Sequence, residues 1–158
     1  MQGRVVRRNT SETMNEKIEA LVVCSNAGPI RDLQRMLTNQ FVKVRQARTC
    51  REAASCLEKP NPPHLIFTDP ELLDGTWAEI LDAAIAAPAA VNVILVVRAD
   101  EIKRYLEAVQ RGVFDLMTPP FSEFDVAHLV KNAVANVLGR RGVSFQQPSR
   151  FSRPVPAS

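Results

Sequence analysis

The chain has 158 residues, of which 46% are hydrophobic and 23% are charged. These values are ordinary for a globular chain with one domain, and they exclude disorder along the whole length. The formal net charge of +3 would by itself suggest a nucleic-acid or membrane-surface partner.

The cysteines and the apolar runs argue against further classes of protein. Three cysteines are an odd number, and no Cys/His cluster has the spacing of metal ligands. Neither a disulfide framework nor a zinc site is therefore expected. The longest weakly polar stretch, 80–97, contains Asp82, Pro88 and Asn92 and does not resemble a membrane span. No apolar stretch follows the N-terminal arginines, so no secretory signal is visible and a cytoplasmic protein is expected.

The chain divides into a basic N-terminal extension, a central block and a basic tail. Residues 1–14 lack periodicity, and Met14 directly precedes a well-patterned segment, so Met14 is a candidate start residue. Residues 139–158 contain three prolines, four arginines and no acidic residue. This composition predicts a disordered tail. The domain itself is expected over 15–138.

Five short apolar runs typical of strands alternate with five segments that carry helical signals. The runs are 20–23, 41–44, 65–68, 93–97 and 113–117. The helical segments are 30–37, 49–57, 76–85, 100–109 and 122–137. Helix boundaries are indicated by the capping pairs Thr49 with Glu52 and Thr76 with Glu79, by Ser122 as an N-cap, and by Gly112 as a stop. Strict alternation of strands and helices predicts an α/β fold, a doubly wound five-stranded parallel sheet with helices on both faces.

In such sheets, ligands and chemistry gather at the carboxyl ends of the strands. The loop after the first strand contains one glycine, and neither a G-x-G-x-x-G nor a P-loop sequence is present, so nucleotide binding is not expected. The two histidines, His64 and His128, do not fall at strand ends, which disfavours nucleophilic catalysis. No enzymatic activity is therefore expected.

One carboxylate directly follows a buried strand. Asp69 comes after Leu65–Thr68, and the sequence continues Pro-Glu-Leu-Leu-Asp-Gly. The stretch HLIFTDPELLDGTWAEIL resembles the third strand, phosphoacceptor aspartate and following loop of response-regulator receiver (CheY-like) domains. GVFDLMTPPF is similar to their fifth-strand segment, and ALVVCSNAGPIRDLQRML to their first strand and helix. The resemblance covers about 17–138 and implies a flavodoxin-like (βα)5 fold with strand order 2-1-3-4-5.

The resemblance makes Asp69 the phosphoacceptor and shows that the other reactive positions are replaced. The family's acidic pair at the end of the first strand corresponds to Cys24 and Ser25. Its Thr/Ser after the fourth strand corresponds to Arg98, and its lysine in the last loop to Pro119. The chain therefore resembles a degenerate receiver, or pseudo-receiver.

Two further positions follow from the same comparison. The aromatic switch residue of the fifth strand corresponds to Leu116. Pro120 matches a proline whose peptide bond is typically cis in the family. The Asp74-Gly75 turn is retained.

The loss of the acidic pair bears on metal binding. Mg²⁺ prefers several oxygen ligands in octahedral geometry, and Asp69 is the remaining carboxylate of the cluster. No cofactor is expected, and the metal site is expected to be absent or weak, with Asp69, Ser25 and the backbone of Glu71 as its ligands.

Arg98 has two interpretations that the sequence leaves open. Its guanidinium can pair with Asp69, occupy the place of magnesium and lysine, and lock the domain in one conformation. Alternatively, the side chain points into solvent.

Function is then expected from protein contacts. The resemblance implies a stand-alone receiver in two-component or phosphorelay signalling, whose partner is a sensor histidine kinase or a downstream signalling protein. The surface of the fourth helix, fifth strand and fifth helix, over 100–110 and 122–138, can also form a homodimer. Candidate exposed positions there are Lys103, Arg104, Glu107, Lys131 and Asn132. The alternative is a phosphorylation-independent interaction or dimerisation module with a vestigial site.

The position of the charge settles the question of nucleic acid. Residues 1–14 carry a net charge of +2 and residues 139–158 carry +4, whereas the block 15–138 carries −3. The basic excess therefore lies in the two end segments, and a nucleic-acid partner is not expected for the domain.

Overall fold

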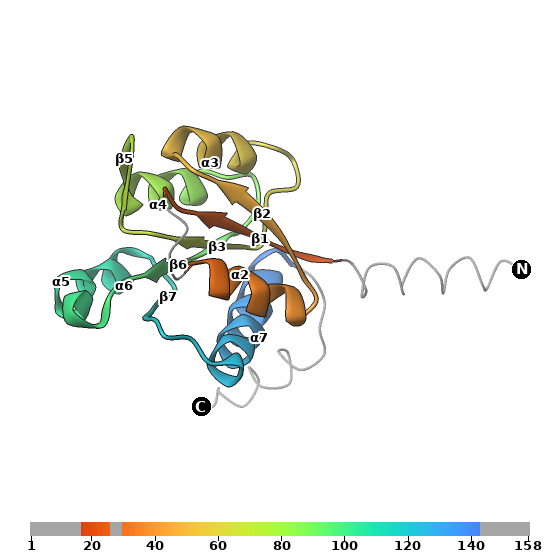
Figure 1. Cartoon of the computed structure of the whole chain (residues 1–158). Coiled ribbons are helices and arrows are strands. Elements are labelled where there is room, and N and C mark those ends of the chain that lie inside the picture. Colours follow the sequence, from red (N-terminus) through yellow and green to blue (C-terminus); the bar gives the residue numbers. More distant parts are fainter. Residues whose placement is uncertain (1–16, 26–29, 143–158) are drawn as a thin grey trace, which may run out of the picture.

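The computed structural model describes residues 17–25 and 30–142 of the chain. Within them, five parallel strands form one sheet in the order β2-β1-β3-β6-β7 (Figure 1). The strands are β1 (Ile18–Val23), β2 (Val42–Ala47), β3 (Leu65–Thr68), β6 (Asn92–Val96) and β7 (Asp115–Met117). In chain order this is 2-1-3-4-5, so the predicted fold class and strand order are confirmed.

Helices cover both faces of the sheet because the central strands are apolar on both sides. Val22, Phe67 and Ile94 face the helices α2 (Ile30–Asn39) and α7 (Glu123–Arg140). Their sequence neighbours, among them Leu21 and Ile66, face the helices α3 (Cys50–Leu57) and α4 (Trp77–Ile85). Strand side chains alternate between faces, so an uninterrupted apolar run supplies two cores at once.

The predicted helix over 100–109 is broken into three short pieces. A 3-10 turn, η1 (Ala99–Glu101), precedes α5 (Ile102–Tyr105) and α6 (Glu107–Arg111). At the junction the backbone N–H of Leu106 donates to the carbonyl of Lys103, a tight turn in place of the α-helical bond. Gly112, with φ of 127°, ends α6, as predicted for the stop of this segment.

A small hairpin that the sequence analysis did not predict follows Asp69. Its strands β4 (Glu71–Leu72) and β5 (Gly75–Thr76) are antiparallel and form a separate two-stranded sheet. Each strand has two residues, too few to produce a periodic pattern in the sequence. The hairpin leads directly into α4.

The last helix extends two residues beyond the predicted domain boundary at 138. α7 ends at Arg140, and the guanidinium of Arg141 donates hydrogen bonds to the carbonyls of Ala90, Pro62 and Pro63. The start of the segment predicted as a tail is thus attached to the domain. The extension 1–14 with Met14, and residues 143–158, lie outside the described residues.

Over the described ranges, no helix is both long enough and apolar enough to cross a membrane.

Candidate functional site

Asp69 lies at the carboxyl edge of the sheet, where β1 and β3 end together. Val23 of β1 pairs with Thr68 of β3, and the backbone N–H of Asp69 donates to the Val23 carbonyl at 3.1 Å. The buried hydroxyl of Thr68 donates to the carbonyl of Asp69 at 3.0 Å. These hydrogen bonds fix the backbone of Asp69 and therefore the position from which its side chain extends.

The carboxyl group of Asp69 is half-buried. Burial removes water from the charged form and raises its pKa from 3.8 to about 6, while a hydrogen bond from the backbone N–H of Ser25 acts in the opposite direction. The raised pKa means that burial is the larger effect. The group therefore changes its charge close to neutral pH.

Cys24 and Ser25, at the end of β1, are the nearest described neighbours from that strand. Burial raises the pKa of the Cys24 thiol, the charge of Asp69 raises it further, and Arg48 lowers it. The thiol is therefore protonated at neutral pH and is a poor ligand and nucleophile. The hydroxyl oxygen of Ser25 is buried and has no hydrogen-bond partner among the described residues.

The donor set at this edge does not fit a strong magnesium site. Cys24 and Ser25 contribute a neutral thiol and a hydroxyl where Mg²⁺ prefers carboxylate oxygens. The side chain of Glu71 is exposed on the hairpin. Across residues 17–25 and 30–142, no group of three or more His, Cys, Asp and Glu side chains is arranged to hold a metal ion. Asp69 alone offers a single carboxylate where Mg²⁺ prefers several oxygen ligands.

Arg98 does not join Asp69. It precedes η1, and its guanidinium pairs with Asp100 at 3.0 Å while 74% of its side chain stays exposed. The hypothesis of an Arg98–Asp69 pair is therefore wrong for this structure, and the solvent-facing interpretation holds. The physical reason is local, since Asp100 lies two residues away and offers a partner without the desolvation that Asp69 would require.

The other replaced positions lie in and after β7. The peptide bond between Pro119 and Pro120 is cis, as the resemblance implied. Leu116 is half-buried against the core on the α4 side of the sheet. Its backbone N–H donates to the Asp115 carboxylate at 2.8 Å. Asp115 lies on β7, an edge strand of the sheet, and this contact is one that the sequence analysis missed.

Asp74 is the second functional position that the sequence analysis underestimated. Its carboxylate accepts hydrogen bonds from the backbone N–H groups of Cys50 at 2.7 Å and Arg51 at 3.1 Å. The helix α3 itself offers no acceptor to these N–H groups of its first turn, so Asp74 caps the helix from a distant loop. The next residue is Gly75, which has no side chain. A Cβ at this position would collide with the Glu79 carboxylate.

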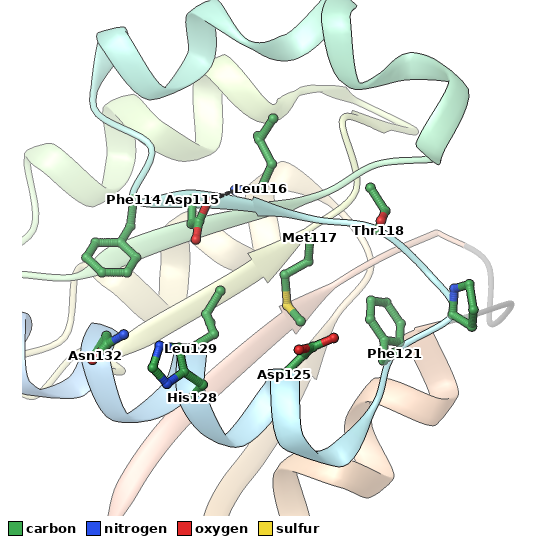
Figure 2. A pocket seen from close by; sticks show the side chains of 11 residues that line it. Phe114, Asp115, Leu116, Met117, Thr118, Phe121, Asp125, His128, Leu129 and Asn132 are labelled. Carbon is green, nitrogen blue, oxygen red and sulfur yellow. Dashed lines mark hydrogen bonds between the residues drawn. The ribbon is translucent and has the colours of Figure 1, made fainter.

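An open groove of about 490 Å³ separates β7 from α7 (Figure 2). Phe114, Met117, Phe121 and Leu129 contribute apolar walls, and Asp125 and His128 contribute polar groups from α7 (Figure 2). Asp69 does not line this groove. The groove coincides with part of the surface that the sequence analysis assigned to partner contacts, over 100–110 and 122–138.

Comparisons with known proteins identify the fold. No family model matches the sequence, and no curated protein matches it. Among solved structures, the signal receiver domain of a Luxo repressor protein from Vibrio parahaemolyticus is similar, with a TM-score of 0.69 and 17% identity. The match covers 82% of this chain and 99% of that chain.

Two further solved structures give the same result. A CheY-like receiver domain protein from Methanospirillum hungatei JF-1 has a TM-score of 0.66 at 18% identity, covering 78% of this chain and 98% of that chain. The receiver domain of sensor histidine kinase PA1611 from Pseudomonas aeruginosa PAO1, which holds magnesium in its active-site cleft, has a TM-score of 0.65 at 18% identity. That match covers 75% of this chain and 98% of that chain. The described domain therefore has the fold of a CheY-like response-regulator receiver domain.

Proposed function

We propose that this protein is a non-enzymatic, cytoplasmic receiver of two-component signalling that acts through protein contacts without magnesium-dependent phosphorylation of Asp69. The observation that supports this most is that the neighbours of Asp69 are neutral. Its described neighbours Cys24 and Ser25 carry no negative charge, and the carboxyl pKa is raised to about 6. The fold is that of a receiver, but the group of charges that its chemistry requires is incomplete.

The chemistry explains why these replacements matter. A carboxylate that attacks a phosphoryl donor brings several negative oxygens together, and cations must stabilise them in the transition state. Pro119 stands where the resembling family has a lysine, and the guanidinium of Arg98 is occupied by Asp100. Neither position therefore supplies a cation to Asp69.

The surface formed by α5, α6, β7 and α7 is the proposed contact region for a sensor histidine kinase, a downstream signalling protein or a second copy. The predicted positions Lys103, Arg104, Glu107, Lys131 and Asn132 are all exposed. Leu106 and Val109 add apolar area, because 54% and 43% of their surfaces are accessible to solvent. Exposed apolar side chains beside charged ones are typical of a surface that binds another protein.

A small phosphoryl donor tests the proposal. The purified protein is incubated with acetyl phosphate and Mg²⁺, and its intact mass is measured, with Asp69→Asn as the control. We expect no phosphorylated species. A double variant, Ser25→Asp with Pro119→Lys, restores one acidic residue and the lysine and is expected to gain Asp69-dependent phosphorylation. Stable modification of Asp69 in the unaltered protein would overturn the proposal.

A phosphorelay receiver in which Asp69 accepts the phosphoryl group is the second candidate. It is favoured by the position of Asp69 at the end of β3, half-exposed and ionised above pH 6. Under this candidate, the unaltered protein is phosphorylated in the same experiment and Asp69→Asn is not.

A further inference from the structure

A second and larger groove lies at the amino-terminal edge of the sheet, opposite Asp69. Its volume is about 820 Å³, and its walls come from the starts of β1 and β2 and from the loop before β3. The strands are parallel, and Ile18 pairs with Val42 at their first residues. The groove and Asp69 therefore lie at opposite ends of the same strands.

Phe41 is the unusual residue of this groove. It directly precedes β2, has a φ of 63°, and exposes 86% of its surface. The left-handed conformation is costly for a bulky residue and is usually occupied by glycine or asparagine where a helix ends. α2 ends here, since the N–H of Phe41 donates to the carbonyl of Thr38. The backbone at Phe41 thus favours a smaller residue. The aromatic ring is also left uncovered by the core of the domain.

The charges of the groove are mainly positive. Lys17 and Lys43 line it, and Arg45 lies beside them. Glu19 is the acidic residue of the lining, and it already pairs with Lys43 at 3.6 Å and Arg45 at 3.8 Å. The complementary occupant therefore carries negative charge.

The two end segments of the chain do not supply that charge. Lys17 and Arg141 both line the groove, so residues 1–16 and 143–158 join the described domain beside it. Their side chains carry net charges of +1 and +2. Like charge disfavours either segment as the occupant.

We infer that this groove docks an acidic, extended segment of a partner protein, with an apolar side chain of that segment packed against Phe41. Val44, which is partly exposed, adds apolar surface to the lining, and Lys17 and Lys43 receive the acidic side chains. A nucleic-acid strand fits less well because Glu19 sits in the lining and a single aromatic ring offers one stacking platform. The site is independent of Asp69 and goes beyond the proposed function, since it gives the domain a binding surface at each edge of the sheet.

Selection from a displayed library of random peptides tests this inference. The full-length protein is the bait, and enriched peptides are measured by fluorescence anisotropy. We expect acidic peptides with at least one large apolar residue, which bind Phe41→Asn about tenfold more weakly, the loss typical of an aromatic anchor. The asparagine variant keeps a residue that tolerates the left-handed conformation, so its fold is expected to be intact.

Matched variants locate the site. Phe124→Asn removes another exposed phenylalanine, at the start of α7, and is expected to leave affinity unchanged. Lys17→Glu with Lys43→Glu is expected to weaken binding about tenfold or more. Lys103→Glu with Lys131→Glu changes net charge equally, and is expected to weaken binding less than twofold in 150 mM salt, where distant charges are screened.

Three results would overturn the inference. They are the absence of enriched peptides, enriched peptides that are neutral or basic, and acidic peptides whose affinity is the same for Phe41→Asn. A single-stranded oligonucleotide and vesicles of phosphatidylserine and phosphatidylcholine are titrated in parallel. Tighter Phe41-dependent binding to either of these would replace the protein partner by that polyanion.

Discussion

The carboxylate of Asp74 accepts a 2.7 Å hydrogen bond from the backbone N–H of Cys50, which joins the loop after Asp69 to the first turn of α3. A second bond from the N–H of Arg51 makes the contact bidentate. Because α3 lies on the face of the sheet that also carries α4, this contact closes the hairpin onto the domain. The hydrogen bonds hold the pKa of Asp74 below its usual value, so the carboxylate stays ionised where it is needed.

Gly75→Ala is expected to destabilise the domain by about 1 kcal/mol, the typical value of a helix cap. A Cβ at this position would displace the Glu79 carboxylate, which accepts a 3.0 Å hydrogen bond from the N–H of Thr76 and completes the capping box of α4. Urea unfolding measures the effect. Gly139→Ala in α7 is the control, because a Cβ there meets no atom, and it is expected to stabilise by about 0.5–1 kcal/mol. Equal effects of the two substitutions would contradict this account.

Asp69→Asn is expected to stabilise the protein above pH 6 and to have a smaller effect below pH 4. The carboxyl pKa rises from 3.8 to about 6 on folding, so the folded protein binds the proton more tightly than the unfolded chain. Stability of the unaltered protein therefore falls as pH rises through this window. The full shift would correspond to about 3 kcal/mol, and we expect about 1–2 kcal/mol because the group is only half-buried.

Urea unfolding of both proteins at several pH values measures this difference. Asp82→Asn, at an exposed position of α4, controls for the loss of one negative charge. A stability difference that does not change between pH 4 and pH 7 would show that burial does not raise the pKa of Asp69.

Arg98→Ala is expected to leave the titration of Asp69 unchanged. The guanidinium pairs with Asp100 in solvent, so its removal withdraws no charge from the carboxyl group of Asp69. A carboxyl-detected NMR titration should give a midpoint near pH 6 in both proteins. Stability should change by less than about 0.5 kcal/mol, as for other exposed ion pairs. A midpoint that rises in the variant would reveal a pairing of Arg98 with Asp69 in solution.

Arg141→Ala is expected to destabilise the full-length protein by about 2 kcal/mol. Its guanidinium donates to three carbonyls from two separate loops, at 2.8, 2.9 and 3.1 Å, and hydrogen bonds from charged donors contribute more than neutral ones. Thermal and urea unfolding check the value. Arg31→Ala, on the exposed side of α2, is the matched loss of an arginine and should change stability by less than about 0.5 kcal/mol. If both variants unfold alike, the contacts of Arg141 do not hold the end of α7.

The sequence was sufficient for the sheet because its strands are determined by local apolar runs. The runs 20–23 and 93–97 lie within one or two residues of β1 and β6, and the pair Thr76 with Glu79 forms the predicted capping box. Asp69 was found for the same reason, since it directly follows a strand that is buried on both faces.

The remainder depends on contacts between distant residues. Gly139 suggested the end of the domain, yet α7 continues because Arg140 donates to the side chain of Asn92 at 2.6 Å, across 48 positions of sequence. The role of Asp74 depends on Cys50, which is 24 positions away. Arg98 was placed at the correct strand end, but the choice between Asp69 and Asp100 is decided by desolvation, which no sequence pattern records.

The positions of Lys17 and Arg141 have a practical consequence. Both residues line the groove beside Phe41, so the two ends of the described domain meet at one pole of the sheet. A short linker from Gly142 to Lys17 in a circular permutant, opened at Leu73 in the exposed hairpin, would run across that groove. Such a permutant would be a covalently blocked form of the protein, with Phe41 shielded.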